Sequence, residues 1–359
     1  MRSRKSACRH IPILLFALTL SGAAQQPGTW RFAVSGDSRN CGDVVMPAIA
    51  KGAMDDNAAF YWHLGDFRAI YRFDQDYWQQ HQTSDPRAMV ISAYLATAWQ
   101  DFIDNQIRPF RIPVYLALGN HELIPPMNRE QVLTKFAEWF NAPGVHEQRL
   151  KDDPQDQTPK SYYHFVRDGI DFLTLDNASS QFDAEQMRWI EAVLSRDEED
   201  GSVRAVVAGM HEALPESISK SHSMNQSLEG EESGKRVYHW LLNFKQNSKK
   251  PVYLLASHSH FYMDGIFDTQ YWRTHGGVLP GWIVGTAGAE RYALPPDATR
   301  AKAAKTHVYG YLLATVSGSK EEPIRFDFRE LKEADVPADV VSRFTPAFVH
   351  ECWADNPVQ

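Results

Sequence analysis

Side chains able to ligate a metal ion follow five apolar segments of this chain. They are Asp37, Asp66, Asn120, His211, His258 and His260. A mixture of carboxylate, amide and imidazole groups suits one or two divalent or trivalent ions such as Mn, Fe or Zn. Polar groups placed just after strands gather at one edge of a sheet. The spacing therefore predicts a metal centre at such an edge.

The apolar segments are the elements that must position these side chains. They are residues 32–34, 60–62, 114–118, 205–208 and 252–256. Each is short and rich in aromatic or β-branched residues, as strands are. Helix-like segments alternate with them, which predicts an α/β sandwich.

Further elements between and after these strands are also readable. Residues 161–166 and 170–175 predict a hairpin closed by a turn at Asp168-Gly169. A helix is expected from Asp183, with Gln186 as its capping-box partner, and another over 130–140. Later strands are expected at 281–285, 309–316 and 324–328.

The order of these motifs resembles the calcineurin-like metallophosphoesterase superfamily, whose pattern is Asp-x-His, Gly-Asp, Gly-Asn-His-Glu/Asp, His and Gly-His-x-His. The matching segments here are 37–39, 65–66, 119–122, 211 and 257–260, within residues 30–316. One fragment alone is a weak signal, whereas all five in order are specific. The resemblance implies a four-layer α-β-β-α sandwich with mixed sheets and hydrolysis of a phosphate ester by a metal-activated water.

The resemblance also implies a role for each residue. Asp66 would bridge two metal ions, one of them completed by Asn120, His211 and His258. Asp37 and His260 would serve the other ion. By the same comparison, His121 is the expected general acid, and Glu122 is expected to orient it.

The sequence departs from the family pattern at three positions. Arg39 replaces the usual metal-binding His of the first motif, and a guanidinium has no lone pair to donate. Ala69 stands where the family's iron-containing acid phosphatases have a tyrosine ligand, and Ser257 replaces a glycine. We therefore expect two unequal metal sites. Arg39 would either hold phosphate oxygens or pair with a nearby carboxylate.

The first 24 residues have the features of a signal peptide. Four basic residues precede an apolar stretch over 11–20, and Gly22-Ala23-Ala24 offers a cleavage site. The stretch is shorter than the roughly 20 residues that span a bilayer, although a retained anchor is the alternative. This predicts a periplasmic or secreted protein with no transmembrane segment in the mature chain.

The net charge of the chain limits the classes of molecule that it is expected to bind. Losing four basic residues and no acidic one with residues 1–24 changes the net charge from −8 to −12. An acidic chain disfavours nucleic acid and favours a small phosphorylated substrate.

Cys41 and Cys352 remain after cleavage and predict a disulfide, the alternative being two unrelated thiols. We expect a catalytic domain over 25–330 and a C-terminal extension over 331–359.

Two functions of different classes remain. The first is a metal-dependent phosphoesterase, with monoesters ranked ahead of diesters. The second is a metal- or phosphate-binding protein on the same fold with little turnover, because Arg39 weakens one metal site. A nuclease ranks third because of the acidic charge. The sequence leaves the substrate, the metal identity and the oligomeric state undefined.

Overall fold

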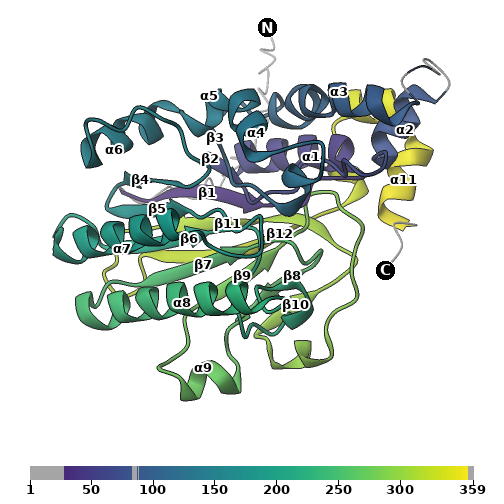
Figure 1. The fold of residues 1–359 in the computed structure, drawn as a ribbon. Helices are drawn as coiled ribbons and strands as arrows, with labels where there is room; N and C mark the ends of the chain where they lie inside the picture. Colours follow the sequence, from purple (N-terminus) through teal and green to yellow (C-terminus); the bar gives the residue numbers. More distant parts are fainter. Residues whose placement is uncertain (1–27, 83–86, 88, 355–359) are drawn as a thin grey trace, which may run out of the picture.

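The protein is a four-layer sandwich in which two mixed sheets lie between two groups of helices (Figure 1). The computed structural model describes residues 28–82, 87 and 89–354. The predicted signal peptide over residues 1–24 lies outside these ranges. Within them, no helix is long and apolar enough to cross a bilayer.

The first sheet has the strand order β12-β11-β1-β2-β3. Its strands are β1 (Trp30–Ser35), β2 (Ala58–His63), β3 (Val114–Leu116), β11 (Tyr309–Val316) and β12 (Ile324–Leu331). Strands β1, β2 and β3 are parallel, and β11 and β12 are antiparallel additions to that core. The carboxyl ends of the three parallel strands therefore meet at one edge.

The second sheet has the strand order β10-β8-β9-β7-β6-β5-β4. Its strands are β4 (Tyr163–Arg167), β5 (Ile170–Thr174), β6 (Ala205–Gly209), β7 (Val252–Ala256), β8 (Tyr262–Asp264), β9 (Gly281–Val284) and β10 (Ala303–Lys305). Strands β5, β6, β7 and β9 are parallel, and the remaining pairings are antiparallel. The sheet is thus mixed, as expected.

Helices cover the outer face of each sheet (Figure 1). On the side of the first sheet lie α1 (Gly42–Asp55), α2 (Gln75–His81), α3 (Ile91–Phe102), α4 (Arg129–Lys135), α5 (Ala137–Phe140) and α6 (Pro143–Asp152). On the other side lie α7 (Ala184–Glu199) and α8 (Leu228–Ser248). Short helical segments join other elements: η1 (Ile103–Ile107), η2 (Asn120–Leu123), η3 (Lys220–His222), α9 (Gln270–Thr274), η4 (Pro296–Arg300) and η5 (Glu333–Asp335).

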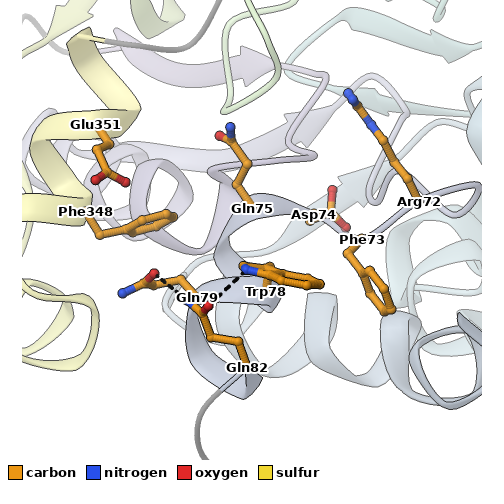
Figure 2. Close-up of a pocket in the computed structure, with 9 residues that line it drawn as sticks. All are labelled: Arg72, Phe73, Asp74, Gln75, Trp78, Gln79, Gln82, Phe348 and Glu351. Atoms are coloured by element: carbon orange, nitrogen blue, oxygen red, sulfur yellow. Dashed lines mark hydrogen bonds between the residues drawn. The ribbon is translucent and has the colours of Figure 1, made fainter. Parts of the chain in front are cut away.

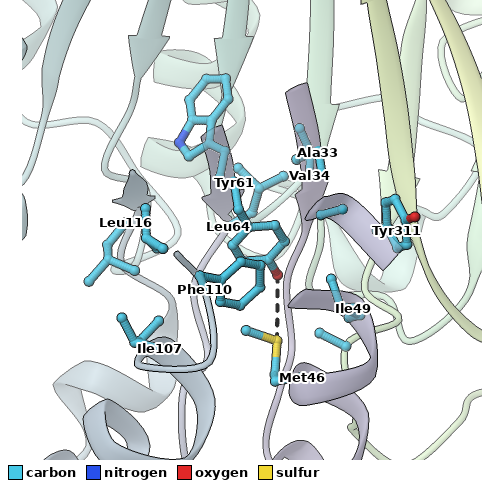
Figure 3. Close-up of a cluster of buried hydrophobic side chains, with 14 of the residues drawn as sticks. Ala33, Val34, Met46, Ile49, Tyr61, Leu64, Ile107, Phe110, Leu116 and Tyr311 are labelled. Carbon is cyan, nitrogen blue, oxygen red and sulfur yellow. Dashed lines mark hydrogen bonds between the residues drawn. The ribbon is translucent and has the colours of Figure 1, made fainter. Parts of the chain in front are cut away.

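Aromatic side chains join the two sheets face to face. Phe32 of β1 stacks on Phe60 of β2, and both meet Phe172 of β5 edge-on at ring-centroid distances of 5.0 and 5.2 Å. On the outer face of the first sheet, Tyr61 stacks on Phe110 at 4.3 Å and its hydroxyl reaches Met46 of α1 (Figure 3). These contacts bury both faces of β1 and β2. The close packing holds the ends of the two strands in place.

Most of the expected local structure is confirmed. Strands β4 and β5 form the predicted hairpin, with Asp168 and Gly169 both at positive φ. Asp183 caps α7 by accepting a hydrogen bond from the Gln186 N–H. The single helix expected over 130–140 is wrong, because it divides into α4 and α5 at Phe136. That residue leaves helical geometry and is buried against Phe67 and other rings.

The C-terminal helices fold back onto the first sheet's helical layer. Helices α10 (Ala338–Phe344) and α11 (Pro346–Ala354) bury Phe344 and Phe348 in the same core as β1 and α1. The predicted disulfide is confirmed: it joins Cys41, just before α1, to Cys352 in α11, with the Cα atoms 6.0 Å apart. The end of the described chain is thereby tied to the turn that follows β1.

Candidate metal centre

The sequence-predicted residues meet where parallel strands of the two sheets end. Asp37 follows β1, Asp66 follows β2, Asn120 follows β3, His211 follows β6, and His258 and His260 follow β7. Asp37, Asp66 and His258 have φ values of 60°, 61° and 61°. Non-glycine residues seldom adopt this left-handed conformation, and strained backbone of this kind concentrates at functional sites.

The turns after β2 and β3 approach each other too closely for side chains. A Cβ at Gly119 would lie 2.2 Å from Asp66 Oδ1, and one at Gly65 would lie 2.4 Å from the Gly119 nitrogen. Glu122 joins the same turns, since its carboxylate accepts hydrogen bonds from the N–H groups of Asp66, Phe67 and Gly119. Glu122 thus braces the two loops, and these three bonds go to backbone N–H groups and not to His121, which it was expected to orient.

Four ligand-type atoms converge on one side of Asp66. His211 Nε2 lies 3.3 Å from Asp66 Oδ1, 3.1 Å from Asn120 Oδ1 and 3.0 Å from His258 Nδ1. His211 Nδ1 lies 2.9 Å from the carbonyl oxygen of Leu64, so this nitrogen carries the hydrogen and Nε2 presents its lone pair to the cluster. Lone pairs of three or four acceptors facing one another repel unless a cation lies among them.

The carboxylates around this cluster also favour a positive charge within it. Burial lowers the pKa of His211, but Asp66 and Asp37 raise it to about 10. A proton on the imidazole would therefore stand in for the metal ion. The donor set of one carboxylate, one amide and two imidazoles fits a divalent or trivalent ion, and Asp66, His211 and His258 form a metal-compatible group.

Arg39 fills the space on the other side of Asp66. Its Nη1 lies 2.7 Å from His121 Nε2, its Nη2 lies 2.9 Å from His260 Nε2, and its Nε lies 3.9 Å from Asp66 Oδ2. The side chain is buried, and burial would lower its pKa, yet Asp66 leads the groups that raise it above the usual value. A permanent positive charge thus lies among Asp66, His121 and His260.

His260 contacts the Arg39 guanidinium, and Asp37 lies between His260 and His258. His260 donates from Nδ1 to the carbonyl oxygen of Glu290, so its Nε2 lone pair faces Arg39 Nη2 and Asp37 Oδ1. Asp37 Oδ2 accepts the His258 N–H. Among the described residues, the buried Asp37 Oδ1 and Arg39 Nε have no hydrogen-bond partner.

His121 also uses its lone pair on Arg39. Its Nδ1 lies 2.8 Å from the Ala69 carbonyl oxygen, which assigns the hydrogen to Nδ1 and leaves Nε2 to accept from Arg39. Burial lowers the pKa of His121, and Arg39 lowers it further against the opposing effect of Asp66. In this arrangement His121 is a neutral acceptor 3.6 Å from Asp66 Oδ2.

Three aromatic side chains outside the five sequence motifs complete the rim, and Tyr292 is the one that the sequence did not single out. Tyr292 stacks on His260 at 3.9 Å, and its hydroxyl lies 3.4 Å from Arg39 Nη2. The loop after His211 bends over the site, placing the His222 ring 5.6 Å from that of His258. The Tyr71 ring lies 5.4 Å from that of His121. No sequence motif marks Tyr292, because only the return of its loop brings it here.

Three further residues, Ser257, His63 and Trp272, have structural roles. Ser257, in place of the usual glycine, donates to the Leu64 carbonyl oxygen and so ties the β7 turn to the β2 turn. His63 is buried, and burial lowers its pKa to about 3. Trp272 is buried against Tyr238.

A family model described as calcineurin-like phosphoesterase matches residues 31–262. A comparison with curated proteins gives no match. Among solved structures, the chain is similar to a purple acid phosphatase from yellow lupin (Lupinus luteus) seeds, with a TM-score of 0.54 and 18% identity over 85% of this chain and 52% of that chain. The chain thus spans about half the length of the lupin protein.

Two further solved structures share the fold. One is a dimetal phosphatase from Danio rerio, with a TM-score of 0.52 and 11% identity over 84% of this chain and 96% of that one. The other is PhoD, with a TM-score of 0.50 and 16% identity over 90% of this chain and 77% of that one. At these identities the likeness establishes the arrangement of sheets and helices.

Proposed function

Since the chain belongs to the calcineurin-like phosphoesterases, we propose that it hydrolyses phosphate monoesters with one tightly held metal ion and the guanidinium of Arg39. The observation that carries this proposal is the different surroundings of the two Asp66 oxygens. Oδ1 faces His211 in the metal-compatible cluster, whereas Oδ2 faces Arg39. One carboxylate thus lies between a cation site and a fixed cationic side chain.

Asp66, Asn120, His211 and His258 would hold the ion. When bound, such an ion neutralises charge on phosphoryl oxygens and makes a nearby water more acidic. Asn120 and His258 are only partly buried, which leaves this side of the centre open to substrate. The chain's contribution is to hold the four donor atoms so close together that their arrangement is favourable only with a cation among them.

Arg39 would bind the phosphoryl group beside the ion. A monoester carries up to two negative charges and a diester one, so an ion together with a guanidinium matches the monoester better. Arginine forms charge-assisted, often bidentate hydrogen bonds with phosphate. Asp37 and His260 would then hold Arg39 in position, and a second ion there would require the guanidinium to move.

His121 would serve as the proton donor to the leaving group. Its Nε2 accepts from Arg39 in the arrangement described, so phosphate oxygens that draw the guanidinium away would free this nitrogen to carry a proton. Its position beside both Arg39 and Asp66 keeps it within reach of the phosphoryl group.

We also propose that the protein acts outside the cytoplasm, in the periplasm or after secretion, on a small phosphorylated compound. The Cys41–Cys352 disulfide supports this location, since disulfides persist in oxidising compartments. Residues 25–330 would form the catalytic domain after removal of 1–24, with 331–359 as the extension that the disulfide attaches.

The test is hydrolysis by purified, metal-stripped protein of p-nitrophenyl phosphate and bis-p-nitrophenyl phosphate, with Mn, Fe and Zn added separately. We expect no turnover without metal, restoration by at least one ion, and a higher kcat/KM for the monoester. Faster hydrolysis of the diester would refute the assigned role of Arg39. Metal binding without turnover of either ester would favour the binding-protein alternative.

A further inference from the structure

The Arg39 guanidinium joins two imidazoles, and each of them contacts a tyrosine ring. At one end, Nη2 lies 2.9 Å from His260 Nε2, and Tyr292 stacks on the His260 ring at 3.9 Å. At the other end, Nη1 lies 2.7 Å from His121 Nε2, and the Tyr71 ring lies 5.4 Å from that of His121. The two tyrosines therefore mark opposite ends of the planar group that is proposed to bind phosphate.

The backbone holds Tyr71 and His121 together through one carbonyl group. The Ala69 carbonyl oxygen lies 2.8 Å from His121 Nδ1 and accepts the Tyr71 N–H at 2.8 Å. Between Ala69 and Tyr71, Ile70 has a φ of 64°, although β-branched residues rarely adopt the left-handed conformation. Its side chain is buried, and its N–H donates to the Tyr94 hydroxyl. Strain of this kind persists where surrounding contacts enforce it, and here the enforced turn places the Tyr71 ring beside His121.

Further contacts fix this loop where it approaches α2. Asp74 Oδ1 accepts the Ala69 N–H at 3.1 Å. The Arg72 guanidinium carbon lies 5.3 Å from the centre of the Tyr71 ring, and the guanidinium pairs with Glu290. Figure 2 shows Arg72 and Asp74 on the segment that leads into α2. The ring is thus positioned before a substrate arrives, which lowers the cost of ordering it on binding.

The Tyr71 ring nevertheless remains open to solvent. Its exposed fraction is 54%, whereas that of the neighbouring His121 is 5%. Burial lowers the pKa of Arg39, whereas Asp66 and, more weakly, Tyr71 raise it above its usual value, so the phenol lies within electrostatic reach of the guanidinium. An exposed aromatic ring so close to a phosphate-binding group offers a stacking surface for the rest of the ester.

We propose that Tyr71 binds the leaving group of the substrate, and that this group carries an aromatic ring attached to the ester oxygen directly or through one carbon. The inference rests on the proposed function for the positions of the phosphate and of the proton donor. A phosphoryl group held at Arg39 turns its leaving oxygen to His121. The width of one imidazole separates Tyr71 from Arg39, and a ring attached at that oxygen spans a similar distance. Aryl and arylmethyl phosphates are therefore the substrate class.

The experiment compares benzyl phosphate with cyclohexylmethyl phosphate as substrates. Both are monoesters of primary alcohols with a six-membered ring, so the ratio of their kcat/KM values isolates the aromatic character and cancels any change at His121. We expect wild type to prefer the benzyl ester by about threefold to tenfold, the usual effect of an aromatic pair. Tyr71→Phe should retain this preference. Tyr71→Leu, which is apolar but not aromatic, should abolish it.

Trp78→Leu is the matched control. Trp78 is also an exposed ring, at 46%, and it lines the cavity between α2 and α11, whose lining residues do not belong to the metal centre (Figure 2). The variant should leave the benzyl preference unchanged. If Trp78→Leu abolishes the preference and Tyr71→Leu does not, the aromatic ring binds elsewhere and the inference is wrong.

Binding of phosphonates separates this inference from the proposed hydrolysis. Benzylphosphonate and cyclohexylmethylphosphonate have a P–C bond in place of the ester, and calorimetry measures their affinities for zinc-loaded protein. Tighter binding of benzylphosphonate that is lost in Tyr71→Leu would support the role of Tyr71 even if no ester were hydrolysed. Equal or undetectable affinities in wild type, or a preference that Tyr71→Leu leaves intact, would overturn the inference even if hydrolysis were confirmed.

Discussion

Asn120→Ala will lose tight metal binding and hydrolysis together. Asn120 Oδ1 lies 3.1 Å from His211 Nε2, among the four atoms proposed to hold the ion. Loss of a group that merely supports a ligand weakens metal binding by about 10- to 100-fold, so losing a ligand should cost at least about 100-fold. We expect a matching fall in kcat/KM for hydrolysis. Metal affinity is measured by calorimetric titration of the same preparation.

Two matched variants control for this prediction. Asn120→Asp keeps an oxygen donor at the same position and should retain much of the metal affinity. Asn141→Ala removes an exposed amide from the turn between α5 and α6 and should behave as wild type. Wild-type metal content and activity in Asn120→Ala would show that Asn120 is not a ligand.

Arg39→Ala will reduce monoester hydrolysis by about 100- to 1000-fold, the usual effect of removing one charged or hydrogen-bonding group that stabilises a transition state. Its guanidinium is the cation beside Asp66 Oδ2, and it contacts both His121 and His260. Hydrolysis of a diester should fall less, because a diester carries less charge for Arg39 to neutralise. The two kcat/KM values, measured at saturating metal, give the comparison.

Arg39→Lys tests whether geometry matters in addition to charge. A lysine ammonium is a single point of charge and cannot reproduce the planar fork that reaches His121 and His260 at once. It should recover only part of the lost activity. Full activity in Arg39→Lys would show that only the positive charge of Arg39 matters. Full activity in Arg39→Ala would show that Arg39 has no role in hydrolysis.

The fold was largely predictable because its signals are local. Strands β1, β2, β6 and β7 are short apolar runs, and a ligand-type residue follows each within a few positions. The hairpin turn and the Asp183 cap also depend on neighbouring residues. The division of the helix at Phe136 was not predictable. It follows from packing against Phe67, which is distant in sequence.

The site was predictable as a set of residues and not as an arrangement. Motif order indicated which side chains gather, and the missing lone pair of Arg39 indicated that the two halves differ. That Arg39 lies between His121 and His260 depends on side-chain conformations that no spacing encodes. Tyr292 reaches Arg39 from a separate loop, so no motif marks it.

The number of metal ions per chain tests the central claim most directly. Calorimetric titration of metal into stripped wild-type protein, and elemental analysis of the reloaded protein, both without phosphate, should give one tight ion per chain. The reason is that Arg39 contributes no lone pair and repels a second cation. Arg39→His should give two, since an imidazole there would join Asp37 and His260 as a ligand. Two equally tight ions in the wild type, or still only one in Arg39→His, would contradict the proposal that Arg39 replaces a metal ion.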